Sequence, residues 1–329
     1  MKKMYFLIGI CLILFSCKRH SVDLENIELR KDYGISQSGD SIFFSGIRSI
    51  FFDKYLYMSN YRMNQILVLD EMGHLICTLG SEGRGPGEFV GVSHIYVSND
   101  TIYALNEGKR CIEVYNIDGY IKTVPLYEAG IRLRNTGRFV ILHNKFYFPY
   151  VTNENSIVEY NLLHESTRYF GLLDRFQTED HTRFRNERHL LAMNEKYLIA
   201  VSHVKPVIEK YNLNGEFIAQ LSYENIYPVQ KRLEFVNRQK SEINSVFSVV
   251  SDAYVYSNKL YLIIVSNEDE KVSSNKVLEI EIDDKMKVLR LYDLGDGWYS
   301  SICVTANNLW AFDTKSDSLK KFPLKTNLD

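Results

Sequence analysis

Short stretches of alternating apolar and polar residues recur along most of the chain. The stretches "ILVLD", "IEVYN", "IVEYN" and "VLEIEID" are rich in β-branched and aromatic residues, which favour strands. They are bounded by "DEMG", "NIDG", "NLNG" and "IDDK", which are typical of tight turns. Helical periodicity is convincing only in residues 229–244, "VQKRLEFVNRQKSEIN", where we expect one short helix. The pattern therefore predicts an all-β protein.

The predicted strands are organised in repeats. Five segments each contain an apolar couplet that begins a strand, a polar interruption, a second alternating strand and a turn; they begin at Lys54, Asp100, Asn144, Glu195 and Asn258. A sixth segment, "NNLWAFDTKSDSLKKFPL", begins at Asn307 and stops before a final strand.

The spacing of these repeats indicates the architecture. Equivalent positions recur every 44 to 63 residues, at Tyr57, Tyr103, Tyr147, Leu198, Tyr261 and Trp310. This period is that of four-stranded propeller blades rather than of helical repeats. The 23 Tyr and 18 Phe residues suit sheets stacked face to face, since aromatic side chains fill wide gaps. We predict a six-bladed β-propeller with four-stranded antiparallel blades.

The two chain ends are expected to close the ring. The sixth repeat lacks its outer strand, whereas residues 23–33, "DLENIELRKDY", alternate as a strand does. We predict that an N-terminal strand completes the last blade, with residues 25–31 paired to residues 317–324. Closure of this kind leaves no exposed sheet edge.

The N-terminus has the features of an export signal. "MKK" is followed by "MYFLIGICLILF", an apolar run too short for a transmembrane span, so residues 1–16 are interpreted as a signal peptide. The run ends in "LFSC", which resembles a bacterial lipobox with Cys17 as the acylated residue. The resemblance implies an outer-membrane lipoprotein, because Lys18 rather than Asp follows the cysteine. Residues 17–22 would then be a lipidated tether and residues 23–329 a single propeller domain. An ordinary cleaved signal with an incidental cysteine is the alternative.

A glycine-rich loop, "LGSEGRGPGEF", occupies residues 79–89. A phosphate-binding loop would need Lys followed by Ser or Thr after its glycines, and then a helix. Neither is present, so we interpret the loop as a connection between blades, in which glycines permit positive φ and Pro86 rigidifies the turn. Phe89 is expected to anchor the loop between neighbouring blades. Arg84 and Glu88 are the residues there that could contact a ligand.

The same region resembles a known family. Residues 79–119 look like an NHL repeat, with a glycine-rich loop, a Phe, an inner strand and a "V-Y-N-x-x-G" strand end. The whole repeated region resembles the six-bladed propeller lipoproteins of Bacteroidetes, in the TolB-like propeller superfamily, whose first interblade loop carries "G-x-G-P-G-E-F". The other blades match only in outline, unlike those of NHL proteins, which repeat the pattern in most blades.

Composition and cysteine usage argue against several classes of partner and site. The net charge of −2, which becomes −4 without Lys2 and Lys3, is too small to indicate nucleic-acid binding. Cys77, Cys111 and Cys303 remain after export and lipidation, and three thiols cannot form a disulfide framework. No CxxC or HExxH spacing occurs. We therefore expect no nucleic-acid partner, no metal site and no cofactor.

The connections between blades are rich in arginine. By the predicted phase they lie on one face of the ring and comprise residues 80–89, 126–139, 171–190, 222–247 and 295–302. They hold ten of the 17 arginines but only two of the 22 lysines. The planar guanidinium suits two-point binding of carboxylate or phosphate, which favours an anionic ligand. The alternative is a set of salt bridges, because the same connections hold eleven Asp and Glu residues.

Candidate ligand-binding residues follow from this distribution. They are Arg84, Arg132, Arg134, Arg183, Arg185, Arg188, Trp298 and Tyr299. The two aromatic residues could stack on sugar rings at the mouth of the ring or could belong to the core. His181 and His189 flank the third connection, where they could serve acid or base chemistry or simply be solvated.

Two classes of function remain. The first is a monomeric, lipid-anchored, non-catalytic module that binds a protein, peptide or carbohydrate through the loop face; it is favoured because no nucleophile motif stands out, and no catalytic residue is assigned. The second is a lactonase-like hydrolase or a lyase, which in related folds uses a central divalent metal. Asn60, Asn106, Asn153 and Asp313 lie near inner strands but form no recognisable ligand set.

Overall fold

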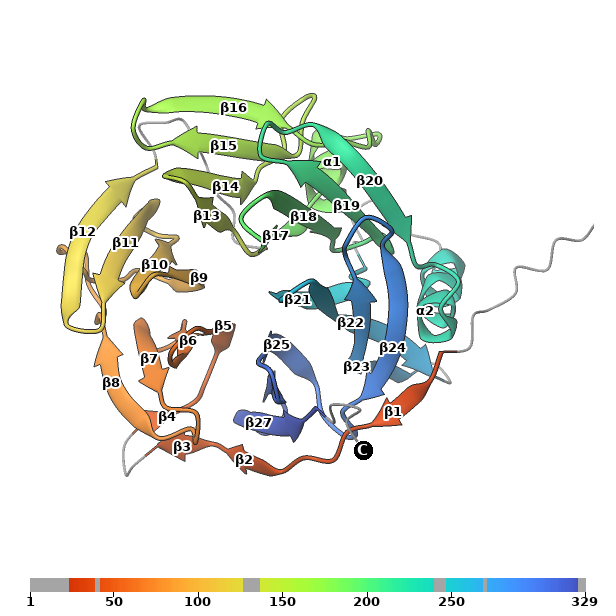
Figure 1. The fold of residues 1–329 in the computed structure, drawn as a ribbon, viewed down its shortest axis with the longest axis horizontal. Coiled ribbons are helices and arrows are strands. Elements are labelled where there is room, and N and C mark those ends of the chain that lie inside the picture. Colours follow the sequence, from red (N-terminus) through yellow and green to blue (C-terminus); the bar gives the residue numbers. More distant parts are fainter. Residues whose placement is uncertain (1–23, 39–41, 127–136, 240–246, 269–270, 325–329) are drawn as a thin grey trace, which may run out of the picture.

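The computed structural model describes residues 24–38, 42–126, 137–239, 247–268 and 271–324. They form six antiparallel sheets arranged in a ring, which confirms the predicted six-bladed propeller (Figure 1). In each of blades 1 to 5, four strands follow one another in sequence from the axis to the rim, whereas the closing blade takes its fourth strand from the N-terminal segment.

Blade 1 consists of β5 (Ile47–Phe52), β6 (Leu56–Asn60), β7 (Gln65–Leu69) and β8 (Leu75–Leu79). Blade 2 consists of β9 (Val92–Ser98), β10 (Thr101–Asn106), β11 (Cys111–Asn116) and β12 (Gly119–Pro125). Blade 3 consists of β13 (Val140–Leu142), β14 (Lys145–Pro149), β15 (Ile157–Asn161) and β16 (Ser166–Phe170). Blade 4 consists of β17 (Arg188–Met193), β18 (Tyr197–Ser202), β19 (Val207–Asn212) and β20 (Phe217–Ser222). Blade 5 contains β21 (Val250–Tyr256), β22 (Lys259–Glu268), β23 (Lys271–Glu281) and β24 (Lys287–Asp293). Blade 6 contains β25 (Tyr299–Val304), β26 (Asn308–Asp313) and β27 (Ser318–Pro323).

Aromatic side chains fill the space between blades, as expected. The six equivalent positions of the repeats all fall on the second strand of their blade. Tyr57, Tyr147 and Tyr211 are fully buried. The rings of Phe146 and Phe148 stack with their centroids 5.7 Å apart. The core is therefore divided among the interfaces between neighbouring sheets.

The N-terminal segment closes the ring, but by a different pairing from the one predicted. β2 (Tyr33–Ile35) pairs antiparallel with β27 and completes blade 6, with Tyr33 opposite Lys321. β1 (Asn26–Glu28) instead pairs parallel with β24, as a fifth strand of blade 5. The prediction that residues 25–31 pair with residues 317–324 is therefore wrong. Alternation shows which side chains point inward, but it does not distinguish the open edges of two adjacent blades.

Beyond β2, β3 (Gln37–Ser38) and β4 (Ile42–Phe43) form a two-stranded sheet. Two helices interrupt the strands. α2 (Tyr227–Arg238) confirms the predicted helix and begins slightly earlier, with Pro228 in its first turn; residues 240–244 of the prediction lie outside the described residues. α1 (Glu179–Arg185) was not predicted, because seven residues are too few for a periodic signal. None of the helices in the described ranges is long and apolar enough to cross a bilayer.

Candidate functional site

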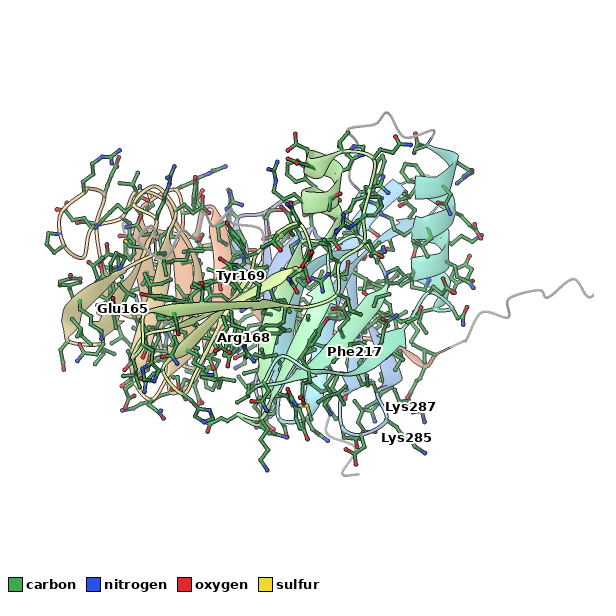
Figure 2. All side chains as sticks on the ribbon, turned by 90° about the horizontal axis from the view of Figure 1, so that it is seen from above. Glu165, Arg168, Tyr169, Phe217, Lys285 and Lys287 are labelled. Carbon is green, nitrogen blue, oxygen red and sulfur yellow. The ribbon has the colours of Figure 1, made fainter. Side chains whose placement is uncertain are left out.

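The two helices rise from the same side of the ring (Figure 2). α1 joins blades 3 and 4, and α2 joins blades 4 and 5, so both belong to connections from an outer strand to the next inner strand. We call this side the helix face. The opposite side, where the first and second strands of each blade turn, is the hairpin face.

Arg138 holds several blades together at the axis of the ring. Its Nε and Nη2 atoms donate to the two carboxylate oxygens of Asp252, each at 2.7 Å. Its Nη1 and Nη2 atoms also donate to the carbonyls of Ile50 at 3.1 Å and Ile302 at 2.8 Å. Burial alone would raise the pKa of Asp252, but Arg138 holds that pKa at about 2. This ionised pair joins blades 1, 3, 5 and 6, and no motif in the sequence predicted it.

Three histidines lie beside the ion pair, and two of them, His94 and His189, are buried. The His189 ring centroid lies 4.1 Å from that of His203 and 6.3 Å from that of His94. Burial lowers the pKa of His94 and of His189 to about 3, and that of His203 well below its usual value, so all three are neutral. Nδ1 of His94 and Nε2 of the other two have no hydrogen-bond partner in the described part of the chain. No group of three His, Cys, Asp or Glu residues within the described ranges could hold a metal ion.

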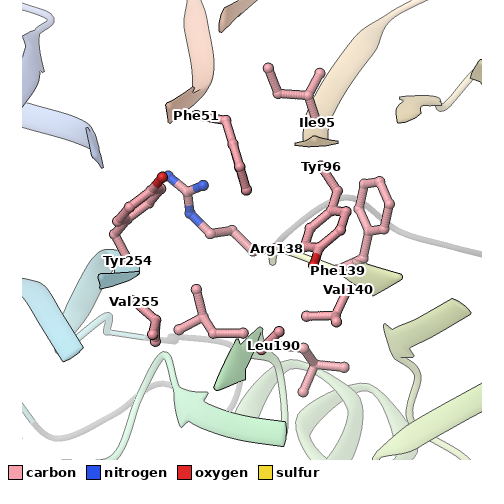
Figure 3. Close-up of a pocket in the computed structure, with 11 residues that line it drawn as sticks. Phe51, Ile95, Tyr96, Arg138, Phe139, Val140, Leu190, Tyr254 and Val255 are labelled. Atoms are coloured by element: carbon pink, nitrogen blue, oxygen red, sulfur yellow. The ribbon is translucent and has the colours of Figure 1, made fainter. Parts of the chain in front are cut away.

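A small pocket lies at the axis, lined by the inner strands (Figure 3). Its volume is about 80 Å³, and its walls are mostly apolar, with Phe51, Tyr96, Phe139, Val140, Leu191 and Tyr254 among them and Arg138 as the cation. Sites for drug-sized ligands are several times larger. The axis of this propeller is therefore largely filled by its own side chains.

The glycine-rich loop has the predicted structural role. Gly80 has φ +76°, and a Cβ on it would lie 2.2 Å from the ring of Phe89. Phe89 is fully buried in a core cluster shared by blades 1 and 2. Lys109 donates to the Gly85 carbonyl at 2.7 Å. Arg84 is exposed at the tip of the loop.

The arginines of the third connection differ in their environments. Arg188 is buried, forms an ion pair with Glu209 and donates to the Asn186 carbonyl at 3.1 Å, so the salt-bridge alternative describes it. Arg183 is partly exposed and forms an ion pair with Asp180. Arg185 lies over the ring of Phe176 at 5.0 Å. Arg132 and Arg134 lie outside the described residues.

The two aromatic candidate residues, Tyr299 and Trp298, also differ in their environments. Tyr299 is fully buried, donates to the Leu294 carbonyl at 3.2 Å and packs edge-on against Phe322. It is a core residue, which leaves it no part in a surface site. Trp298 is partly exposed, and its backbone N–H donates to Asp313 Oδ1 at 2.9 Å.

A hollow of about 470 Å³ lies beside α1 on the helix face. Its lining includes Thr152, Asn153, Arg175, Phe176, Thr178, Glu179, Thr182 and Arg183. Arg175 donates to the Asn153 carbonyl at 3.0 Å, and the buried Nε of Arg183 has no hydrogen-bond partner among the described residues. The lining holds two arginines and one glutamate, and Arg183 is paired with Asp180, which lies outside the lining. A second hollow, of about 550 Å³, adjoins α2.

The residues considered for a central metal do not converge. Asn60, Asn106 and Asp313 end the second strands of three different blades, and Asn153 lies in a loop of a fourth. Asn106 accepts from the Val90 N–H at 3.0 Å, and Asp313 accepts from Lys320 at 2.7 Å. Asn106 therefore holds the connection that precedes blade 2, and Asp313 is paired with a cation on the adjacent strand β27. His181 is buried within α1.

The chain is similar in fold to several solved structures. Among solved structures, a member of the DUF4221 family from Bacteroides vulgatus has a TM-score of 0.61 at 10% identity, covering 94% of this chain and 99% of that chain. A predicted exported protein from Bacteroides fragilis has a TM-score of 0.59 at 12% identity, covering 92% and 99%. Catalytically inactive virginiamycin B lyase from Staphylococcus aureus, with quinupristin, has a TM-score of 0.54 at 10% identity, covering 89% and 99%.

At such identities the likeness shows the fold alone. No curated protein matches the sequence. Residues 37–272, however, match the model of the DUF5128 family, described as a 6-bladed β-propeller. The match spans more than half of the chain, and this chain therefore belongs to the DUF5128 family of six-bladed β-propellers.

Proposed function

We propose that this chain is an outer-membrane lipoprotein that acts as a non-catalytic binding module for an anionic glycan, peptide or protein partner. The export signal and the lipobox-like "LFSC" support lipidation at Cys17. Several acyl chains would anchor the protein stably, since each buried methylene adds about 0.8 kcal/mol. A Cys17→Ala variant should lack lipid by mass spectrometry and leave the membrane fraction; retention there without lipid would contradict the anchor.

The observation that carries the binding proposal is the hollow beside α1, where arginine side chains and an aromatic wall meet. Arg175 and Arg183 line it, Arg185 and Lys205 lie over its Phe176 wall, and its volume falls in the range of ligand sites. Guanidinium groups beside an aromatic wall suit a carboxylate or phosphate carried on a larger molecule. Arg84 and Trp298 lie elsewhere on the helix face and would contact only an extended partner.

A double substitution tests this site. We expect Arg183→Ala with Arg185→Ala to weaken binding of polygalacturonate or of a Glu-rich peptide at least about tenfold, as loss of one charge-assisted hydrogen bond would. The matched control is Lys285→Ala with Lys287→Ala, which removes two exposed cations from the opposite side of the molecule (Figure 2). Wild-type affinity in the arginine variant would eliminate the hollow as the site.

A propeller hydrolase or lyase with a central divalent metal is the second candidate. Its support is the fold shared with virginiamycin B lyase. Metal analysis of the purified protein, with melting curves before and after chelation, tests it. A bound divalent ion and a lower melting temperature after chelation would favour the enzyme. Absence of both the ion and the change in melting temperature would count against it.

A further inference from the structure

Blades 3 and 5 carry the same ladder of charged side chains across three neighbouring strands. In blade 3, Glu159 lies in register with Tyr147 on one side and Arg168 on the other. Lys145 Nζ lies 3.0 Å from Glu159 Oε1, and Arg168 Nη2 binds Oε2.

Blade 5 repeats this arrangement of residues. Glu279 lies in register with Tyr261 and Arg290. Lys259 binds Oε1 of Glu279, and Arg290 faces Oε2. The two arginines therefore occupy equivalent positions on the outer strands of their blades.

In blade 3, the arginine also fastens its blade to the next one. Arg168 donates to the backbone carbonyls of Leu213, at 2.8 Å, and of Asn214. Both carbonyls belong to the turn between the third and fourth strands of blade 4. The guanidinium of Arg168 thus binds both the carboxylate of Glu159 and the turn of the neighbouring blade.

Arg290 has no such turn beside it, because of the way the ring closes. The fourth strand of blade 6 is β2, from the N-terminal segment, so β27 does not turn back into it. Nη1 of Arg290 lies 3.8 Å from Glu279 Oε2, and its guanidinium also donates a hydrogen bond to the Tyr292 hydroxyl. No backbone carbonyl of the described residues accepts a hydrogen bond from it. Ring closure therefore leaves Arg290 without the two backbone acceptors that Arg168 has in the neighbouring turn.

A hollow of about 330 Å³ occupies this place, between blades 5 and 6 on the hairpin face. Its lining includes Tyr256, Lys259, Tyr261, Glu279, Arg290 and Tyr292. Glu279 is 1% exposed and already accepts from Lys259 and, at 2.5 Å, from the Tyr292 hydroxyl. The lining holds two cations and one carboxylate, and the exposed Glu25 of the N-terminal segment lies near Arg290 as a second carboxylate. Tyr256, 37% exposed, supplies an aromatic wall.

We propose that this hollow binds a compact carboxylate-bearing ring compound, such as a sugar acid. The carboxylate would take the place that the blade 4 turn occupies beside Arg168, with Arg290 as its main donor, and the ring would pack on Tyr256. The volume lies at the lower end of the range for ligand pockets, which fits one ring rather than a polymer. The site is separate from the helix face and does not depend on the function proposed above.

Titration of the purified full chain with D-glucuronate, followed by NMR, tests the proposal, with D-glucose as the neutral match. We expect saturable binding of glucuronate and none of glucose. Arg290→Gln should weaken glucuronate binding at least about tenfold. Lys285→Ala, an exposed cation of the same blade, should leave it unchanged.

A second variant keeps the test decisive if Arg290→Gln lowers the melting temperature. Tyr256→Ala removes a partly exposed wall and should weaken glucuronate binding while the protein melts as the wild type does. Equal responses to glucuronate and glucose, or unchanged affinity in both variants, would overturn the proposal. Absence of saturable glucuronate binding to the wild type would overturn it as well.

Discussion

Arg138 and Asp252 are 114 residues apart in sequence, yet they share two parallel hydrogen bonds of 2.7 Å at the axis of the ring. Asp252 also accepts from Ser301 Oγ at 3.0 Å and from the Ile302 N–H at 2.9 Å. One carboxylate therefore satisfies donors from blade 3 and blade 6. A buried ion pair of this kind persists only where its remaining donors and acceptors are also paired.

Substitution of Arg138 by Met should destabilise the protein strongly. Asp252 would be left buried without its counter-charge, and loss of one partner of a buried pair costs about 3–5 kcal/mol. Urea unfolding followed by fluorescence measures the effect. The double variant Arg138→Met with Asp252→Leu should be less destabilised than the single one, because no charge is left unpaired. A single variant as stable as wild type would show that the pair does not hold the ring together.

Stability should decrease as the pH is lowered from about 6.5 to about 3. In the unfolded chain a histidine takes up a proton near pH 6.5, whereas burial keeps His94 and His189 neutral in the folded protein down to about pH 3. Each contributes a slope of up to about 1.4 kcal/mol per pH unit in that window. The stabilisation from Asp252 is present above its unfolded pKa of about 3.9 and is lost as the pH falls towards 2.

Urea unfolding at several pH values checks this prediction. His94→Leu should reduce the slope, since its unfolded state no longer gains that proton. A free energy of unfolding that stays constant between pH 6.5 and pH 4 would contradict the assignment of neutral buried histidines.

Phe89→Ala should weaken the joint between blades 1 and 2. Removal of a fully buried Phe typically costs about 3–5 kcal/mol, and Phe89→Leu should cost clearly less. Gly80→Ala should also destabilise, because φ there is +76° and the new Cβ would meet the Phe89 ring. Urea midpoints of the three variants, compared with wild type, measure these effects. Equal midpoints for all four proteins would show that the loop does not anchor the blades.

Leu29→Ala should loosen the closure of the ring. Leu29 is 6% exposed and belongs to the core cluster that includes residues of blades 5 and 6, so we expect a loss of about 2–5 kcal/mol. Hydrogen exchange should accelerate in β2 and β27 before it does in blade 3. Arg30→Ala, at an exposed neighbouring position, should change stability by less than about 0.5 kcal/mol. Uniform exchange across all blades would contradict a local role for the N-terminal segment.

Much of the fold could be predicted because a propeller blade is a local unit. Its strands are consecutive in sequence, so the period-two pattern and the repeat length contain the information that builds it. Tyr57, Tyr147 and Trp310 lie on second strands as their alignment predicted, and Phe89 anchors its loop. The helix around residues 229–238 was also readable, since its periodicity extends over several turns.

The sequence alone thus determined the number of blades, the order of their strands and the character of the glycine-rich loop. Tertiary structure decided which edge the N-terminal residues join, that Arg188 is buried while Arg183 is partly exposed, and that Arg138 meets Asp252 at the axis. The contact between Arg138 and Asp252 joins different blades, and it depends on how the closed ring sets the blades side by side. Local patterns of apolar and polar residues contain no information on that spacing.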